Sequence, residues 1–130
     1  MKTPAKHTKG QSLVEFALVV PMILVLLVGT MEFSRAWMTM NVLTGAAREA
    51  ARIYAAQNNP AAADARADNV LSSGGLDLAR RTILRPPPPP GGAVSYTIIY
   101  DFPVSVAGFV PGLSASTKTL RSTTTMRREW

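Results

Sequence analysis

The stretch GQSLVEFALVVPMILVLLVGTM, residues 10–31, decides the fold of this 130-residue chain. From Leu13 to Met31 it carries a single charge, Glu15. An apolar run of this length can cross the hydrocarbon core of a bilayer as a helix. Basic residues precede it and no acidic residue accompanies them, so the positive-inside rule places the N-terminus in the cytoplasm. We therefore expect a single-pass protein of the inner (cytoplasmic) membrane, with its C-terminal part in the periplasm or outside the cell.

Two simpler interpretations of this run are an ordinary cleaved secretory signal and a plain uncleaved anchor. A secretory signal has a shorter core and a small-residue cleavage site after it, and Met31-Glu32-Phe33 offers no such site. Glu15 argues against both interpretations, because an isolated carboxylate in a membrane helix costs about 2.5–3.5 kcal/mol. If the chain is cut after Gly10, the new amino group on Gln11 lies one helical turn away. Pairing would offset part of the desolvation cost of both charges.

The residues around this position resemble a known signal. Lys9-Gly10 followed by Gln11–Phe16 and a continuous apolar helix resembles the class III signal of type IV pilin-like proteins. Residues 9–56 resemble the TadE-like pseudopilins of the tight-adherence (Tad/Flp) pilus. This likeness depends on GQSLVEFAL, on Glu32-Phe33 and on the AAREAAR block. The C-terminal half is similar only in pattern, with late strands and the ending Met126–Glu129.

The resemblance implies a role for several residues. A membrane-embedded prepilin peptidase would recognise Gly10, remove residues 1–10 and leave Gln11 as the mature N-terminus. Glu15, followed by Phe16, would pair with a terminal amine of its own or a neighbouring subunit during assembly. The implied protein is a minor pilin or pseudopilin that supports pilus biogenesis, adhesion and biofilm formation. Its partners would be the peptidase, other pilin or pseudopilin subunits and the Tad inner-membrane assembly proteins.

The helix should extend beyond the membrane. We assign residues 11–35 to the transmembrane segment, with a kink at Pro21 because proline cannot donate the helical hydrogen bond. Residues 36–130 form the extracytoplasmic domain. The helix runs from Leu13 to about Ala56, roughly 66 Å at 1.5 Å per residue. One face of its outer half is apolar, and we expect this face to pack in the core of the same chain rather than at a subunit interface. The face consists of Ala36, Met40, Leu43, Ala47, Ala50 and Tyr54.

Weaker signals follow this helix. Asn59 and Pro60 suit the N-cap and first position of a second helix that continues over Ala61–Leu71. Leu76–Leu84 is expected to form one or two further helical turns. The segment 86–92 is proline- and glycine-rich, and we interpret it as a stiff linker between helix and sheet, or alternatively as a proline-rich ligand for an aromatic groove.

Alternation of apolar and polar residues predicts a strand over Val94–Asp101. Val104–Val110 is interpreted as a second strand or an irregular crossing. The threonine-rich segment Ser116–Arg127 is expected to be a half-buried edge strand. These elements predict an α+β fold, in which a long N-terminal transmembrane helix extends into a small periplasmic domain with short helices and an antiparallel sheet.

The residue inventory argues against catalysis. There is no cysteine, and the only histidine is His7 in the leader. Asp64 and Asp68 lie one turn apart and could suggest a metal or acid–base pair, but Arg66 and the alanine-rich setting indicate a solvated face. Arg127-Arg128 beside Glu129 is weak evidence for phosphate binding. We expect that the protein is not an enzyme and that it binds no metal, cofactor, nucleic acid or small-molecule substrate. A permanently membrane-anchored periplasmic binding module remains the alternative function.

Overall fold

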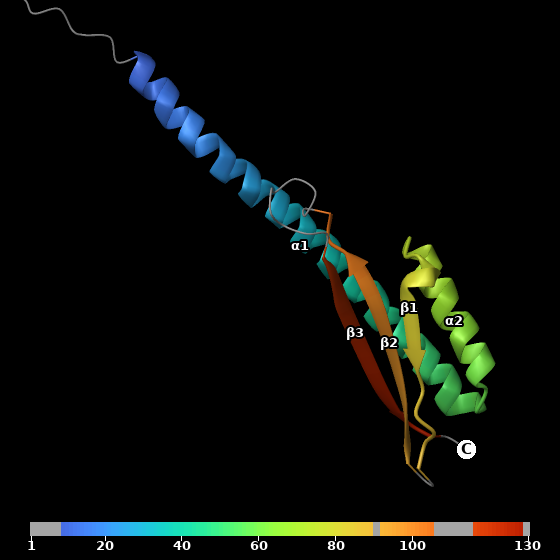
Figure 1. Cartoon of the computed structure of the whole chain (residues 1–130). Helices are drawn as coiled ribbons and strands as arrows, with labels where there is room; N and C mark the ends of the chain where they lie inside the picture. Colours follow the sequence, from blue (N-terminus) through green and yellow to red (C-terminus); the bar gives the residue numbers. More distant parts are fainter. Residues whose placement is uncertain (1–8, 90–91, 106–115, 129–130) are drawn as a thin grey trace, which may run out of the picture.

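The computed structural model describes residues 9–89, 92–105 and 116–128. One long helix, α1 (Lys9–Gln57), runs the length of the molecule, and a small head packs against its C-terminal half (Figure 1). The head contains a second helix and a three-stranded antiparallel sheet. The predicted α+β architecture is therefore confirmed.

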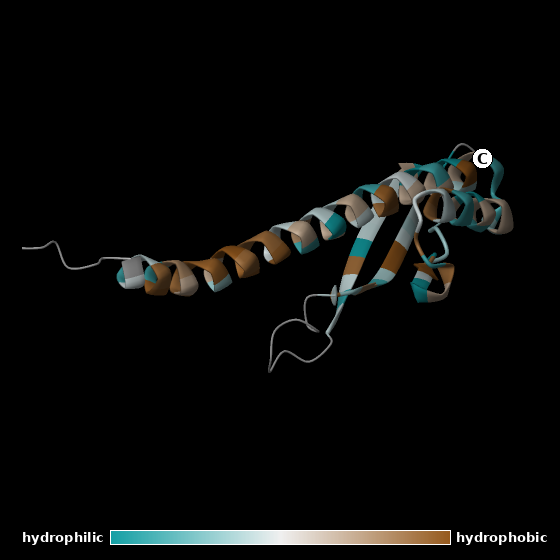
Figure 2. Ribbon diagram, turned by 90° about the horizontal axis from the view of Figure 1, so that it is seen from above, coloured by the Kyte–Doolittle hydropathy of each residue, from teal (hydrophilic) through white to brown (hydrophobic). Residues whose placement is uncertain are grey.

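The N-terminal half of α1 is apolar and uncovered. Apart from the half-buried Val20, its large apolar side chains between Leu13 and Leu27 are 49–74% exposed. Figure 2 shows this half as a continuous hydrophobic stretch that projects away from the head. Among the described residues, α1 is long and apolar enough to cross a membrane. The helix continues through Pro21, since its hydrogen-bonded turns extend on both sides of the proline.

The C-terminal half of α1 is the centre of the core. Ala46, Ala47, Ala50 and Ala51 are completely buried, and so is Leu43. Because alanine adds little beyond the backbone, neighbouring elements can lie close to this face of the helix. The prediction that AAREAAR forms an intramolecular core is thus confirmed.

The second helix, α2 (Pro60–Ser73), begins where the sequence predicts. The Asn59 side chain accepts a hydrogen bond from the Ala62 backbone N–H at 3.0 Å, which satisfies one unpaired amide of the first turn. Asn58 has φ of 49°, a left-handed conformation that asparagine tolerates better than most residues. The chain therefore reverses sharply, and α2 lies against α1 (Figure 1).

The sheet contains β1 (Arg81–Leu84), β2 (Ala93–Pro103) and β3 (Thr117–Arg127) in the order β1-β2-β3. β2 is central, and every second residue on it is buried in the core that the helices share: Val94, Tyr96, Ile98, Tyr100 and Phe102. The opposite face carries polar cross-strand pairs, such as Thr97 with Thr123, whose hydroxyls lie 2.9 Å apart. The alternation predicted for β2 and the edge position predicted for β3 are both confirmed.

Two sequence-based expectations need correction. In Leu76–Leu84 only one short 3₁₀ turn, η1 (Leu78–Arg80), is helical, and β1 follows it directly. The proline-rich segment consequently joins strand to strand, not helix to sheet. The sequence did not predict β1 because four residues are too few to show an alternation of apolar and polar side chains. The strand forms by pairing with β2, from Arg81 opposite Tyr100 to Leu84 opposite Thr97. Of the possible strand Val104–Val110, Val104 is outside β2 and residues 106–110 lie outside the described residues.

Gly74, at the end of α2, lies very close to α1. A Cβ built on Gly74 would lie 2.5 Å from Cγ1 of Val42, so Gly74→Ala forces the two segments apart. We expect it to lower the free energy of unfolding by about 1–3 kcal/mol. The matched control is Gly45→Ala, where nothing lies within 4 Å and alanine should instead stabilise α1 by up to about 1 kcal/mol. Thermal unfolding in detergent micelles measures both. Equal effects of the two substitutions would contradict the close approach.

Candidate functional site

The four residues of the predicted processing and pairing signal all lie in the first two turns of α1. Gly10, Gln11, Glu15 and Phe16 are exposed, and nothing in the described structure would contact a Cβ at Gly10. The Gln11 side-chain amide donates to Glu15 Oε1 at 3.4 Å, a long and exposed contact one turn apart. The first turn of a helix lacks intrahelical partners for its N–H groups and opens easily. The Gly10–Gln11 bond is therefore in the part of α1 that unwinds at least cost.

The direction of the Glu15 side chain matters for pairing. Side chains on a helix tilt toward its N-terminus, so the Glu15 carboxylate leans toward residue 11. The hydrogen bond from Gln11 shows that this carboxylate already reaches the preceding turn. An amino group at the start of a chain cut after Gly10 would enter the same region. The geometry thus allows the charge pair that the spacing suggests.

A polar junction marks the point where the apolar half of α1 ends. The Glu32 carboxylate accepts from the Ser105 backbone N–H at 2.7 Å and from Arg35 Nη1 at 3.0 Å. Arg35 also donates to the Ser105 hydroxyl at 2.7 Å, and its guanidinium lies 5.4 Å from the Phe102 ring centroid. The Glu32 side chain is only 15% exposed. This Glu32–Arg35–Ser105 junction fixes the end of β2 against α1.

The sequence interpretation assigned no role to this junction, although a signal for it is present. Glu32 is the first charge after the uncharged run that follows Glu15, and Arg35 comes one turn later. Such an i,i+3 pair at the end of a membrane-length run indicates an interface position. The contact with Ser105, by contrast, has no local signal because it joins residues far apart in sequence.

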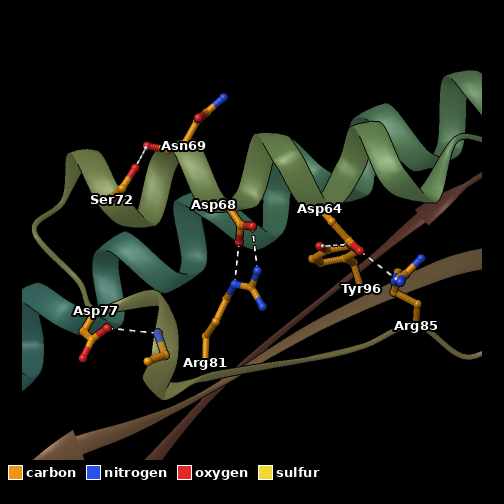
Figure 3. A network of polar contacts seen from close by, with 9 residues as sticks. Asp64, Asp68, Asn69, Ser72, Asp77, Arg81, Arg85 and Tyr96 are labelled. Carbon is orange, nitrogen blue, oxygen red and sulfur yellow. Dashed lines mark hydrogen bonds and ion pairs between the residues drawn. The ribbon is translucent and has the colours of Figure 1, made fainter.

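The two aspartates of α2 do not form a solvated face, and that interpretation is wrong. Asp64 accepts from the Tyr96 hydroxyl at 2.7 Å and pairs with Arg85 Nη2 at 2.9 Å. Asp68 binds Arg81 through both carboxylate oxygens. Figure 3 shows the two carboxylates pointing from α2 to β1 and β2, each toward its own partners. Because both are used in fastening α2 to the sheet, they do not constitute an acid–base pair.

This network also changes proton affinities. Burial raises the pKa of Tyr96 far above its usual value, and the hydrogen bond to the Asp64 carboxylate adds to the increase. The hydrogen bond to Asp68 raises the pKa of Arg81, which keeps the guanidinium charged. Within the described ranges, no group of three His, Asp or Glu side chains could hold a metal ion.

Comparison with known proteins gives one family match, and it lies within α1. Residues 10–52 match the model of the family described as TadE-like protein. This segment is TadE-like. The match begins at Gly10 and includes Glu15, Glu32 and the alanine face of α1, so the resemblance inferred from the sequence is confirmed there. No curated protein and no solved structure shows significant similarity to the chain. The TadE-like region thus combines the exposed apolar helix with the part of α1 that forms the core.

The protein should lose stability at alkaline pH through Tyr96. Because the folded-state pKa of Tyr96 is raised above the unfolded value of about 10, the unfolded chain releases the proton first. The stabilisation is complete below pH 10 and is lost as pH rises above it, by up to about 1.4 kcal/mol per pH unit.

In Tyr96→Phe this loss of unfolding free energy above pH 10 should disappear. Urea unfolding in detergent micelles between pH 8 and pH 11.5 measures it. Asp64→Asn serves as an intermediate control, since it retains an acceptor without the charge. Parallel wild-type and Tyr96→Phe curves above pH 10 would disprove the role of this phenol.

Proposed function

We propose that this TadE-like protein is a minor pilin or pseudopilin of a Tad-type pilus assembly system. The observation that carries the proposal is a carboxylate, Glu15, on the exposed apolar half of α1. The alanine-lined half of the same helix is already used in the head, whereas the apolar half has no protein around it within the described chain. Lipid or other subunits must cover this half. A charge on such a surface favours subunits, because they can supply an opposite charge.

The position of the charge supports processing by a prepilin peptidase. Cleavage after Gly10 would place an ammonium group on Gln11, within one turn of Glu15. The pair could form within one chain or between neighbours. In a low dielectric, either arrangement favours a defined register between packed helices. Assembly into a pilus, or onto its base, would follow from helix packing guided by this register.

The junction at Glu32 and Arg35 supports a fixed depth in the membrane. These charges end the uncharged run, and the head begins immediately after them. Because the junction ties the head to this turn of α1, the head and the membrane surface would keep a constant spacing. A subunit that enters an ordered assembly needs such a spacing, whereas a flexible tether would suit a free binding module. With Lys2, Lys6 and Lys9 before the apolar run, the head would lie on the periplasmic side.

Processing can be tested directly. Protein extracted from membranes of a host with an active prepilin peptidase should begin at Gln11. Intact-mass measurement and N-terminal sequencing both report this start. Gly10→Val should block the cut, since a side chain replaces the residue that the peptidase would recognise, and the variant should retain residues 1–10. A wild-type chain that keeps Met1 under these conditions would support the alternative, a permanently anchored binding module.

The pairing role of Glu15 gives a second test. Glu15→Ala should leave insertion and cleavage largely intact but reduce incorporation into pili or co-purification with partner subunits at least tenfold. Glu15→Gln should behave similarly, because it keeps the shape and loses the charge. The matched control is Glu49→Gln on the outer part of α1, which should assemble normally. Quantitative immunoblots of sheared pili and membrane fractions provide the measurement. Normal assembly of Glu15→Ala would exclude the pairing mechanism.

A further inference from the structure

Large apolar side chains stay exposed on α1 beyond the end of the uncharged run. Phe33, Trp37 and Met38 are 62–68% exposed. The Phe33 and Trp37 rings stack, with their centroids 6.2 Å apart. After Met38 the exposed residues of α1 are polar or small, namely Asn41, Arg48, Arg52, Ala56 and Gln57. The exposed surface of the helix therefore becomes polar after Met38 and not at Glu32, where the charges begin.

Phe33 and Trp37 lie at the depth of the interfacial layer of a bilayer. A hydrocarbon core of about 30 Å takes about twenty helical residues, so a core that begins at Leu13 ends near Glu32. The interfacial layer beyond it is roughly 5–7.5 Å thick, because the whole bilayer measures about 40–45 Å. Phe33 and Trp37 follow Glu32 by about 1.5 and 7.5 Å along the helix axis. Their side chains also lean toward the N-terminus, so both rings fall within this layer.

The neighbouring polar side chains are compatible with this depth. The Glu32 carboxylate is largely buried and accepts from the Ser105 backbone N–H and from Arg35. A charge within a membrane is expensive unless it is paired, and this one is paired. Arg35 is half exposed, and long basic side chains of this kind extend to lipid headgroups. The polar junction can therefore lie in the interfacial layer without an unpaired charge.

The base of the head reaches the same level. β3 starts beside the middle of α1 (Figure 1). Lys118 on β3 pairs with Phe102 on β2, and the centroid of the Phe102 ring lies 5.4 Å from Arg35 Cζ. Lys118 is exposed, and β3 carries no acidic residue. Its ammonium group therefore lies close to the depth of Arg35, where a cation is attracted to the phosphates of anionic lipids.

We propose that Phe33, Trp37 and Lys118 form a lipid-binding surface that seats the head in the headgroup layer of the membrane. The two rings insert where the headgroups meet the acyl chains, as is common for tryptophan, and Lys118 binds a lipid phosphate. Lipid is the occupant because the surface continues directly from the exposed apolar half of α1. This contact requires α1 to cross the membrane, as the proposed function does, but it requires neither cleavage after Gly10 nor assembly.

Depth-dependent fluorescence quenching tests the position of Trp37. Trp130→Phe leaves Trp37 as the only tryptophan of the full chain. The chain is reconstituted in vesicles of phosphatidylethanolamine and phosphatidylglycerol that carry a quencher either on the headgroup or at the end of an acyl chain. Trp37 should lose most of its emission to the headgroup quencher and little to the acyl-chain quencher. Acrylamide in the water should quench it less than a tryptophan outside the membrane.

Two matched variants calibrate the depth, because α1 returns to the same side after eleven residues. In the Trp130→Phe/Trp37→Phe background, Leu26→Trp lies about 17 Å deeper and Arg48→Trp about 17 Å further out. Both positions are exposed, so neither substitution disturbs the core. Leu26→Trp should respond to the acyl-chain quencher, and Arg48→Trp should respond to acrylamide.

A fluorophore on Thr119→Cys tests the contact made by the adjacent Lys118, since the natural chain has no cysteine. The headgroup quencher should reduce the emission of this dye. The same dye on Arg127→Cys, about 27 Å away along β3, should be unaffected. Adding Lys118→Gln should weaken the quenching at Thr119→Cys, whereas Arg121→Gln, on the same strand, should leave it unchanged. If Lys118→Gln has no more effect than Arg121→Gln, Lys118 binds no lipid.

The same vesicles separate the lipid contact from the proposed function. Quenching of Trp37 by acrylamide alone, with Leu26→Trp quenched from the acyl chains, would mean that the head stands clear of the membrane and would overturn the lipid-binding surface. Protection of Trp37 from all three quenchers would place the rings against protein and overturn it as well. If Leu26→Trp is not quenched from the acyl chains, α1 does not cross the membrane and both proposals fail. If Trp37 is quenched from the headgroups while membrane-extracted protein retains residues 1–10, the lipid contact stands and only pilin-type processing fails.

Discussion

The close packing of the alanine face of α1 is the interaction on which the rest of the structure depends. Ala47 and Ala51 on α1 and Ala63 and Ala67 on α2 are fully buried, and the two helices are in contact. Side chains little larger than the backbone thus line much of the core. This leaves the sheet enough room to lay its aromatic and branched side chains across both helices. The head is small, and a small head buries only a modest apolar area. Its stability therefore depends on this face remaining small and continuous.

The same helix has to satisfy two environments. Its outer half is held by protein contacts, and its apolar half has none among the described residues. The polar junction at Glu32 separates the two, because its carboxylate is engaged by the head on one side of the boundary. A rigid connection between an apolar helix and a folded head transmits the position of one to the other. Packing of the apolar halves would thus determine how the heads are arranged.

The carboxylates illustrate how context decides the role of one chemical group. Asp64 and Asp68 are paired with arginines and a tyrosine, and they fasten α2 to the sheet. Glu32 holds a backbone amide at the boundary. Within the described chain, Glu15 makes only a long contact with Gln11. The surrounding surface of α1 is apolar. The first two groups have structural partners, and the proposed function gives Glu15 a partner from processing or from a neighbouring subunit.

The sequence by itself determined the elements whose signals are local. The apolar run predicted α1, the pair Asn59-Pro60 predicted the start of α2, and alternation predicted β2, because each depends on neighbours within a few residues. The candidate signal at Gly10 and Glu15 was inferred from the charge of Glu15 within the apolar run and from the resemblance to the signals of type IV pilin-like proteins. Only the tertiary structure decided β1, the fastening by Asp64 and the junction with Ser105. A four-residue strand has too few positions to display a period, and contacts between distant residues leave no periodic trace in the chain.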